Sequence, residues 1–403
     1  MNNKNFNVFV GIDISKDSFS ACALTNPQNI LFEEKFPMSH SGFKDFSKRL
    51  SRFPKNSILI AKESSGCYYI NLFAYLSQRH FHCIVLNPLL VNKFWTATLR
   101  KTKTDRTDAK AIAIMLYHVH KQLPGKSFLP KDFRDIARER ERITQQIATV
   151  KNDIEKNLVV LFPELERIVN IYNSSILKLL SVFPSAYAIK KASIEQINNA
   201  LCSETAGRPV NVSAQQIKSL AKKSIAQYWP VRELILVQKI KELFFLEEQL
   251  EFFTNMLREF CEEASLCQDI EILKSIKGVG DITALHFLAE VGDIERFDSP
   301  KKLIAYCGID PTVYESGRFK GKSKISKRGN RHLRRIVWLM SIGVVMHNEY
   351  FREYYNKKRA EGVVYKKAIL AVAHKLLRTV WAMLTKKQPF FVNHALSPCF
   401  LRR

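Results

Sequence analysis

The first 110 residues are the part of the sequence that most restricts the possible folds. Three short apolar runs, NVFVGIDI, SFSACAL and NILFEEKF, follow one another between residues 7 and 36. Amphipathic stretches then alternate with two further apolar runs, SILIAKE and HCIVLNP. Short apolar runs are typical of buried strands, and apolar residues at 3-and-4 spacing are typical of helices. Three meandering strands followed by alternating helices and strands predict a ribonuclease-H-like α/β sheet.

Four carboxylates stand at strand ends or helix starts in this region. Asp13 ends the first strand, Glu63 ends SILIAKE, and Asp105 and Asp108 open the helix that begins near Thr104. In a ribonuclease-H-like sheet the first and fourth strands are neighbours, so we expect Asp13 and Glu63 to lie side by side. Asp105 and Asp108 share one helix face, with Cβ atoms roughly 5–6 Å apart.

Carboxylate oxygens of this kind suit Mg²⁺ or Mn²⁺ better than zinc. Two such ions about 3.5–4 Å apart can clamp the attacking and leaving oxygens of a phosphodiester. Each acid alone is as often a helix cap or a solvated surface charge. The joint pattern of four is what predicts a metal site.

Residues 131–265 have the pattern of long helices. Apolar residues at 3-and-4 spacing run through Ile136, Ile143, Ile147, Val150 and Ile154, with Arg140 at one position of the seam. A second stripe contains Leu236, Ile240, Leu243, Leu246, Leu250, Phe253, Leu257 and Phe260. Such helices pack on each other or across a dimer, and a long core helix within one subunit is the equal alternative. Residues 166–230, broken at Pro184 and by GRP at 207–209, predict only helical pieces.

We therefore predict three regions. An α/β domain occupies residues 1–130, a helical coiled-coil dimerisation region occupies 131–265, and a mainly helical domain occupies 266–403. The last begins with ILKSIKGVGDITALHFLAEV, the pattern of a helix-hairpin-helix in which Gly278 and Gly280 expose backbone N–H groups to a phosphate. A plain turn between two helices explains these glycines equally well.

The last quarter of the chain is strongly basic. Residues 301–403 contain 23 Lys or Arg against 5 Asp or Glu, which accounts for 18 of the 25 net positive charges. Such an asymmetry indicates a polyanionic partner, most plausibly nucleic acid. Between Arg318 and Arg335 there are nine Lys or Arg, no acid, and three interleaved glycines counted from Gly317. Glycines let a backbone approach a phosphate, and the cations neutralise it, although a solvated basic loop is the alternative.

The nucleic-acid contacts predicted from this segment are Arg318, Lys320, Lys322, Lys324, Lys327, Arg328, Asn330, Arg331 and Arg334. Ser316 stands at the head of the segment, before a glycine, so its hydroxyl is a candidate nucleophile. Ser323 and Ser326 are its rivals.

The eight cysteines are scattered, with no C-x-x-C pair, which argues against a zinc site. We interpret them as small core residues in a reducing cytoplasm. The N-terminus has no apolar region of the signal-peptide type, and the apolar stretch around Trp338–Met346 is about half a membrane span. No membrane location is expected.

Several of these segments together resemble one known family. VGIDISKDSF, KESSGCYY, VLNPLLVNKFWTATLRKTKTDRTDAKAIA and the stretch from IKGVGDITALHFLAEV to SKRGNRHLRR are similar, in this order, to the DEDD transposases of insertion sequences. That group includes the Piv/MooV-type DNA invertases and the bridge-RNA-guided recombinases. The resemblance is loose over residues 166–235.

This resemblance implies a RuvC-like N-terminal domain whose metal-binding acids are Asp13, Glu63, Asp105 and Asp108, and a C-terminal transposase domain whose nucleophile is Ser316. The serine of one subunit would attack a DNA phosphate and form a phosphoserine link, activated by Mg²⁺ held on the acids of another. The implied partners are DNA ends and target, a second copy of the chain in a dimer or tetramer, and, as a suggestion, a bridge RNA. The implied setting is a bacterial cytoplasm, at the nucleoid.

Two other functions fit the residues. One is a RuvC-like junction-resolving nuclease in which metal-activated water cleaves DNA and Ser316 is structural. The other is a non-catalytic nucleic-acid-binding protein whose acids only stabilise the fold.

Overall fold

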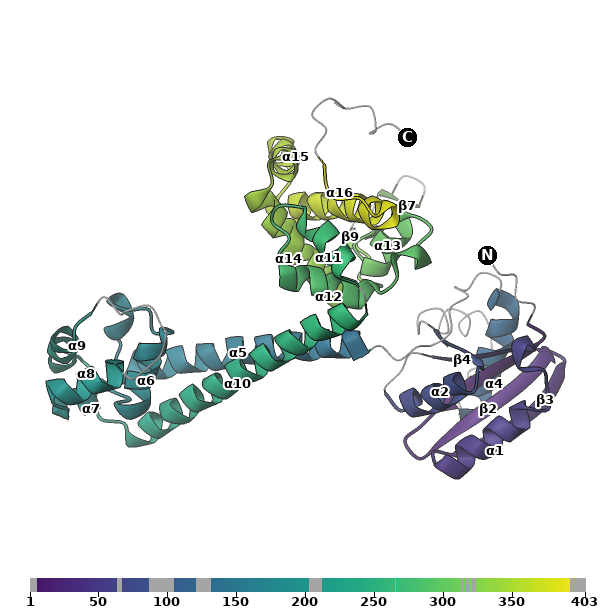
Figure 1. Ribbon diagram of the computed structural model, residues 1–403, viewed down its shortest axis with the longest axis horizontal. Helices are drawn as coiled ribbons and strands as arrows, with labels where there is room; N and C mark the ends of the chain where they lie inside the picture. Colours follow the sequence, from purple (N-terminus) through teal and green to yellow (C-terminus); the bar gives the residue numbers. More distant parts are fainter. Residues whose placement is uncertain are drawn as a thin grey trace. The chain divides into compact units, whose positions relative to one another are not determined.

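The computed structural model describes residues 6–63, 67–86, 105–120, 132–202, 212–264, 266–312, 315–316, 319–320 and 324–391 (Figure 1). At residues 105–107, 202, 312, 315–316, 319–320 and 324 it describes the backbone alone. The chain forms two compact units, Met1–Lys131 and Asp132–Arg403, which are described separately. The predicted boundary near residue 265 falls inside the second unit and stays a prediction.

A five-stranded mixed sheet forms the centre of the first unit. Its strands are β1 (Val8–Ile14), β2 (Ser18–Asn26), β3 (Asn29–Pro37), β4 (Ile58–Glu63) and β5 (His82–Leu86), in the spatial order β3-β2-β1-β4-β5. The first three strands are an antiparallel meander, whereas β4 runs parallel to β1 and β5 runs parallel to β4. The predicted α/β class of this unit and the adjacency of its first and fourth strands are confirmed.

Helices cover both faces of this sheet. On one face, α1 (His40–Leu50) and α2 (Tyr69–Gln78) pack on Val10, Ile12 and Ile60, and a 3₁₀ turn at Lys55–Ser57 leads into β4. Ser39 starts α1 because its side chain accepts a hydrogen bond from the Gly42 N–H. On the other face, α4 (Asp105–Val119) packs on the remaining residues of the same strands, such as Phe9 and Ala61. Alternate residues of β1 and β4 thus belong to different faces.

Two long helices, α5 (Asp132–Leu161) and α10 (Pro230–Glu263), pack along each other within one chain (Figure 1). The predicted seam residues are buried or half-buried between them, among them Ile147 and Leu243. Arg140, the polar member of the seam, donates from Nε to Thr254 Oγ1 at 2.8 Å. Packing within one subunit was one of the alternatives left open by the sequence; a role in dimerisation stays a prediction.

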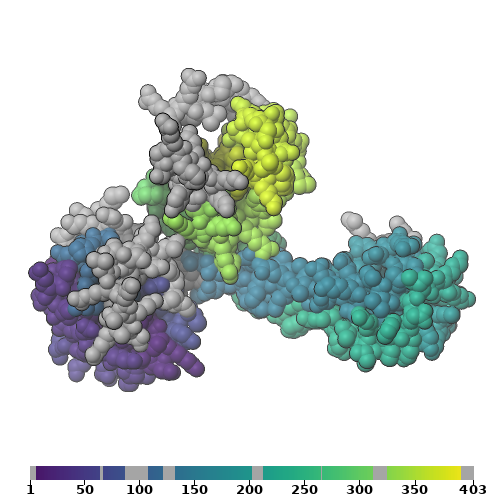
Figure 2. All heavy atoms as spheres, turned by 180° about the vertical axis from the view of Figure 1, so that it is seen from behind, coloured from purple at the N-terminus to yellow at the C-terminus, as the bar shows by residue number. Residues whose placement is uncertain are grey.

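Four short helices pack against the C-terminal end of α5 and the N-terminal start of α10, and are called the head. They are α6 (Ser174–Val182), α7 (Ala186–Lys191), α8 (Ile194–Cys202) and α9 (Ala214–Lys222), preceded by a 3₁₀ turn at Leu165–Arg167. Their apolar residues share one core with the adjoining parts of α5 and α10, and Figure 2 shows the teal atoms of this head packed as one body. Pro184 separates α6 from α7, and Ser185 then caps α7 by accepting from the Ala188 N–H at 3.0 Å.

The remainder is mainly helical, as predicted. It contains α11 (Cys267–Lys274), α12 (Asp281–Val291), a 3₁₀ turn (Ile294–Arg296), α13 (Pro300–Cys307), α14 (Arg331–His347), α15 (Glu349–Ala360) and α16 (Tyr365–Lys386). The two helices predicted on either side of Gly278 and Gly280 are α11 and α12. Four two-residue strands, β6 (Pro311–Thr312), β7 (Glu315–Ser316), β8 (Phe319–Lys320) and β9 (Lys324–Ile325), lie between α13 and α14.

One helix of this region, α16, is by length and composition apolar enough to cross a membrane. Half of its most apolar stretch is buried within the protein, where residues such as Val372 and Leu376 pack on α14 and neighbouring helices. This is the environment of a core helix.

Not every cysteine is in the core. Cys22, Cys83, Cys261 and Cys307 are buried, in agreement with the interpretation from sequence. Cys67 and Cys267 are exposed, because each lies at or just before the start of a helix whose first turn faces solvent.

Candidate active site and nucleic-acid interface

Asp13 and Glu63 lie at the carboxyl ends of adjacent parallel strands. The register pairs Ile12 of β1 with Lys62 of β4, so the next residues along, Asp13 and Glu63, are neighbours across the two strands. Strand alternation places both on the face that α4 covers, since Gly11 and Ala61 face that helix. Both carboxylates are half-buried. The expected proximity of these two acids along the sheet edge is thus present in the backbone.

The helix α4 approaches β1 at Gly11 with no side chain between them. A Cβ atom at Gly11 would lie 2.1 Å from the Ala109 carbonyl oxygen and 2.4 Å from the Ala113 nitrogen, so only glycine fits. Near the other end of α4, Tyr117 packs edge-on to Phe9, with ring centroids 5.5 Å apart. The helix therefore runs antiparallel to β1, and its first turn points toward Asp13.

Asp108 belongs to that first turn, directly before Ala109. Its side chain is half-buried, and one of its carboxylate oxygens is shielded from solvent. Asp105 is the first residue of α4, and its side chain lies outside the described set. Three of the four predicted acids are therefore brought to one edge of the sheet, and the fourth stands one helical turn before Asp108.

The chemistry of these donors fits a hard divalent cation, since all are carboxylate oxygens. Among the side chains that the structure describes, however, no three acids, histidines or cysteines are close enough to form a metal-binding group. This finding includes Asp13, Glu63 and Asp108, whose side chains are described, so the structure does not gather these three into a metal-binding group; the side chain of Asp105 is not among those described.

Ser316 lies on a β-hairpin made of two nested antiparallel pairs. Pro311 pairs with Ile325, and Ser316 pairs with Phe319. Residues 317 and 318, which join this last pair, lie outside the described residues, as does the side chain of Ser316. Ser316 is thus the last residue of β7, and it is paired with the first residue of β8.

Ser326, an alternative candidate nucleophile to Ser316, forms hydrogen bonds within the protein. Ser326 Oγ donates to Asp310 Oδ1 at 2.5 Å, and the Ser326 N–H donates to the Asp310 carbonyl at 2.8 Å. Both bonds hold the end of β9 against the residues after α13. Ser323, the other rival, lies outside the described residues. A structural role for Ser326 makes it the weaker candidate nucleophile.

Comparison with known proteins gives two family matches. A family model described as a transposase matches residues 10–163, and a second, described as the transposase IS116/IS110/IS902 family, matches residues 270–356. The chain belongs to this family of transposases. The first match contains Asp13, Glu63, Asp105 and Asp108, and the second contains Ser316.

Relatives of this transposase match it over most of its length. It is 24% identical to an uncharacterized protein of insertion element IS116 from Streptomyces clavuligerus, over 97% of this chain and 98% of that protein. It is 22% identical to the pilin gene-inverting protein of Moraxella lacunata, over 95% and 97%. It is 21% identical to the transposase for insertion sequence element IS1111A of Coxiella burnetii, over 94% and 90%.

The basic segment of the transposase divides into exposed and internal residues. Lys327, Arg328 and Arg331 are exposed, and Lys327 has a positive φ of 52°. Asn330 and Arg334 are instead used within the protein. Asn330 caps α14 with its side-chain oxygen and donates to Glu290 at 2.6 Å, and Arg334 donates to the Cys307 carbonyl at 3.1 Å.

Four other predicted contacts in this segment lie outside the described side chains; these are Arg318, Lys320, Lys322 and Lys324. Phosphate contact thus stays a prediction for them and for the three exposed cations.

The two glycines of the predicted helix-hairpin-helix have different environments. Gly278 has φ +102°, and a Cβ there would lie 2.4 Å from the Gly343 carbonyl oxygen of α14. Gly280 has open space, with its nearest atom at 3.9 Å. Asp281 follows it in the first turn of α12 and pairs with Arg258 at 3.3 Å. Close helix packing thus explains Gly278, whereas a Cβ atom at Gly280 would meet no close neighbour, and phosphate contact at Gly280 stays a prediction.

A buried ion-pair network that the sequence did not reveal joins α5 to the C-terminal helices. Arg138 donates to both oxygens of Glu290, at 2.6 and 2.9 Å, and Glu290 is 1% exposed. The hydrogen bonds from Arg138 and Asn330 hold the pKa of Glu290 below its ordinary value, although burial alone would raise it. Glu141, also buried, binds Arg335 of α14 at 2.9 Å. These contacts fix the start of α14, and so the end of the basic segment, against α5.

Lys62 is a second residue whose position was not predicted. It is 2% exposed, and its ammonium nitrogen lies 4.0 Å from the centre of the Tyr69 ring, on the sheet face opposite Glu63. Burial lowers the pKa of Lys62 to about 8, while the nearby charges of Glu63 and Asp13 act to raise it. The signal in the sequence was a lysine inside the apolar run SILIAKE.

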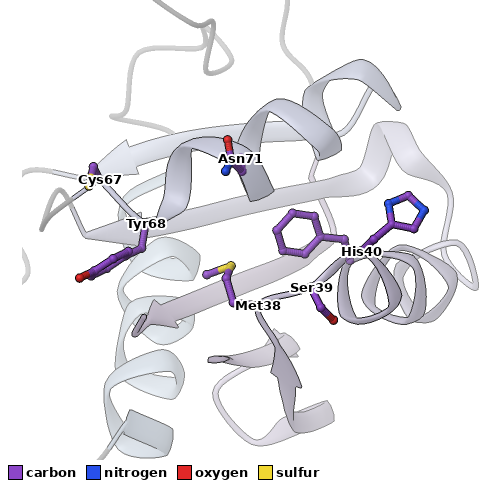
Figure 3. Close-up of a pocket in the computed structure, with 7 residues that line it drawn as sticks. Met38, Ser39, His40, Cys67, Tyr68 and Asn71 are labelled. Atoms are coloured by element: carbon purple, nitrogen blue, oxygen red, sulfur yellow. The ribbon is translucent and has the colours of Figure 1, made fainter. Parts of the chain in front are cut away.

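A hollow of about 370 Å³ lies at the edge of the sheet where Asp13 and Glu63 stand, between the starts of α1 and α2 (Figure 3). It is lined by Met38, Ser39, His40, Phe43, Cys67, Tyr68 and Asn71. Figure 3 shows Met38 and Asn71 on opposite sides of it. The lining residues come from two separate segments, residues 38–43 and 67–71, which is why no sequence motif indicated it.

Proposed function

We propose that this transposase is a Mg²⁺-dependent DNA recombinase with a ribonuclease-H/RuvC-like N-terminal domain, and that it cleaves and joins DNA strands of an insertion sequence through Ser316. The observation that carries the proposal is the position of Asp13 and Glu63 side by side beneath the first turn of α4. The strand order β3-β2-β1-β4-β5 supports the fold assignment. Relatives named for transposition and for gene inversion support DNA rearrangement as the reaction class.

In this proposal each residue has a defined task. Asp13, Glu63, Asp105 and Asp108 would hold Mg²⁺, with Mn²⁺ as a substitute, and the bound metal would supply charge stabilisation at the reacting phosphate. The Ser316 hydroxyl loses its proton as its oxygen bonds to phosphorus, one phosphorus–oxygen bond of the DNA strand breaks, and the departing DNA oxygen takes up a proton. The resulting phosphoserine keeps the energy of the broken bond, so rejoining to a new strand needs no energy-rich co-substrate such as a nucleotide.

Further partners follow from the family resemblance. The acids of one subunit would act with Ser316 of another, in a dimer or a tetramer on DNA. Lys327, Arg328 and Arg331, with the other cations of the segment, would neutralise DNA phosphates. A bridge RNA is a further partner of this proposal.

The test uses the purified protein and a plasmid that carries the element with its flanking DNA. Asp13→Asn and Ser316→Ala should each lower strand cleavage by roughly a thousandfold or more, as loss of a catalytic group does. Chelating Mg²⁺ should stop cleavage. Asp17→Asn is the control, because Asp17 is an exposed acid on the turn after β1 and should leave cleavage unchanged.

Denaturing gels separate this mechanism from its main alternative. Wild-type reactions should contain DNA covalently attached to protein, and Ser316→Ala should abolish that adduct while Ser326→Ala retains it. Cleaved DNA without any adduct would instead establish a nuclease that uses activated water. Normal recombination by the Asp13 variant would refute the metal site.

A further inference from the structure

The head on the ends of α5 and α10 displays an unusual set of exposed aromatic residues. Tyr187 of α7 is 36% exposed, and Tyr228 and Trp229, just before α10, are 53% and 50% exposed. Ile225 beside them is 77% exposed. Residues 164–269, which include this head, lie outside both family matches. Water-exposed rings at this density are typical of a binding surface.

Two of the rings contact each other, and a cation lies over one of them. The centroids of Tyr187 and Tyr228 lie 4.6 Å apart, with their planes inclined by 35°. The Lys191 ammonium lies 4.2 Å from the centre of the Tyr187 ring. Trp229 follows Tyr228 directly and precedes Pro230, which fixes the backbone at the start of α10.

The charge around these rings is positive. Within residues 185–202 and 212–229 there are five lysines and a single acid, Glu195. Four of the lysines are exposed; they are Lys190, Lys191, Lys222 and Lys223. Two acids from outside these ranges accept hydrogen bonds from serines of this region. Glu233 accepts a hydrogen bond from Ser185 Oγ, and Glu164 accepts one from Ser224 Oγ.

This composition distinguishes between two kinds of partner. Tyr and Trp are enriched in protein–protein interfaces, but Lys is depleted there. Rings interleaved with lysines are typical of surfaces that bind single-stranded nucleic acid, where bases stack on the rings and cations follow the phosphates. A duplex keeps its bases stacked on one another and would offer these rings little to bind.

We propose that Tyr187, Tyr228 and Trp229, with Lys190, Lys191, Lys222 and Lys223, bind an unpaired nucleic-acid strand. RNA and DNA strands share the chemistry that this surface recognises. The proposal is tested by binding alone, so it stands or falls independently of cleavage through Ser316.

The test measures the affinity of the full-length protein for short fluorescent single strands of RNA and of DNA with one sequence. Tyr228→Ala combined with Trp229→Ala should weaken single-strand binding by roughly tenfold or more. Tyr228→Phe with Trp229→Phe should retain it, because phenylalanine still stacks. Phe252→Ala is the matched control, since Phe252 is 54% exposed on α10 and lies outside this surface.

Two further readouts define the outcome. Changing the four lysines to glutamine should lower the log–log salt slope by roughly 0.7 for each phosphate that the protein no longer neutralises. A loss of affinity for RNA alone would identify RNA as the ligand, and an equal reduction for both would mean that either strand binds. Unchanged single-strand affinity in the double alanine variant would overturn the proposal. A drop in molar mass by light scattering without a change in affinity would also overturn it, in favour of an interface between subunits.

Discussion

At the scale of single residues, this transposase uses glycine for two separate purposes. Gly278 has a backbone conformation that L side chains rarely adopt, and it lies against the backbone of Gly343. Gly280 is unconstrained, with φ −84° and open space around it. The sequence shows the same residue twice in one motif, yet only the three-dimensional packing separates a fold requirement from a candidate phosphate contact.

This difference gives a prediction with an internal control. Gly278→Ala should lower the free energy of unfolding by about 3 kcal/mol, because a strained φ and a close backbone contact act together. Gly280→Ala should leave the free energy of unfolding within about 0.5 kcal/mol of wild type, measured by urea denaturation. If α12 receives a phosphate, Gly280→Ala should still weaken binding to duplex DNA. Equal stability of both variants would contradict the role assigned to Gly278.

At the scale of elements, the positions of the strands along the chain could be predicted from the sequence, because each strand is a short apolar run bounded by turns. The long helices were predictable for the same reason, from the spacing of Ile147 or Leu243. Contacts between distant segments were not predictable. Arg138 and Glu290 are separated by 152 positions, and neither stands out among its neighbours. The helices of the head were also missed in detail, since short amphipathic pieces carry weak periodicity.

The Arg138–Glu290 pair also makes stability depend on pH. Glu290→Gln should cost about 2 kcal/mol at pH 7, less than a fully buried pair would, because the Arg138 side chain is 37% exposed. The folded-state pKa of Glu290 is lowered, so its contribution is present above the unfolded pKa of about 4.3 and is lost as pH falls through the folded pKa.

Urea denaturation of wild type and variant across pH measures this dependence. The difference between them should shrink below about pH 4. Glu295→Gln, an exposed acid in the next turn, is the control and should show no difference at either pH. A difference that persisted undiminished at low pH would mean that packing, rather than charge, accounts for the destabilisation.

At the scale of the whole molecule, the net charge of +25 predicts that binding to DNA depends strongly on salt. The prediction of nucleic acid as partner came from composition alone, but composition could not say which cations are available. The structure shows that Arg334 and Arg335 have partners within the protein, whereas Lys327, Arg328 and Arg331 face solvent. For the acids, the sequence indicated which strand ends they occupy, and the sheet register supplied their proximity.

Changing Lys327, Arg328 and Arg331 together to glutamine should lower the log–log salt slope for duplex binding by about 0.9 per phosphate, or nearly 3 in total. The same change at Lys357, Lys366 and Lys367, which are exposed on α15 and α16, removes equal charge at another place. This control should alter the slope much less. Identical slopes for the two triple variants, measured by titration at several salt concentrations, would mean that net charge and not local contact governs binding.

The backbone-to-backbone contact between α4 and β1 at Gly11 has a consequence for how this enzyme responds to mutation. Most helices contact a sheet through side chains, so the distance between helix and sheet changes when those side chains are replaced. Here the distance between α4 and β1 is set by main-chain atoms, which do not change when side chains are mutated. Mutations elsewhere in the domain can therefore vary its stability while the gap between the strand acids and the helix acids is preserved.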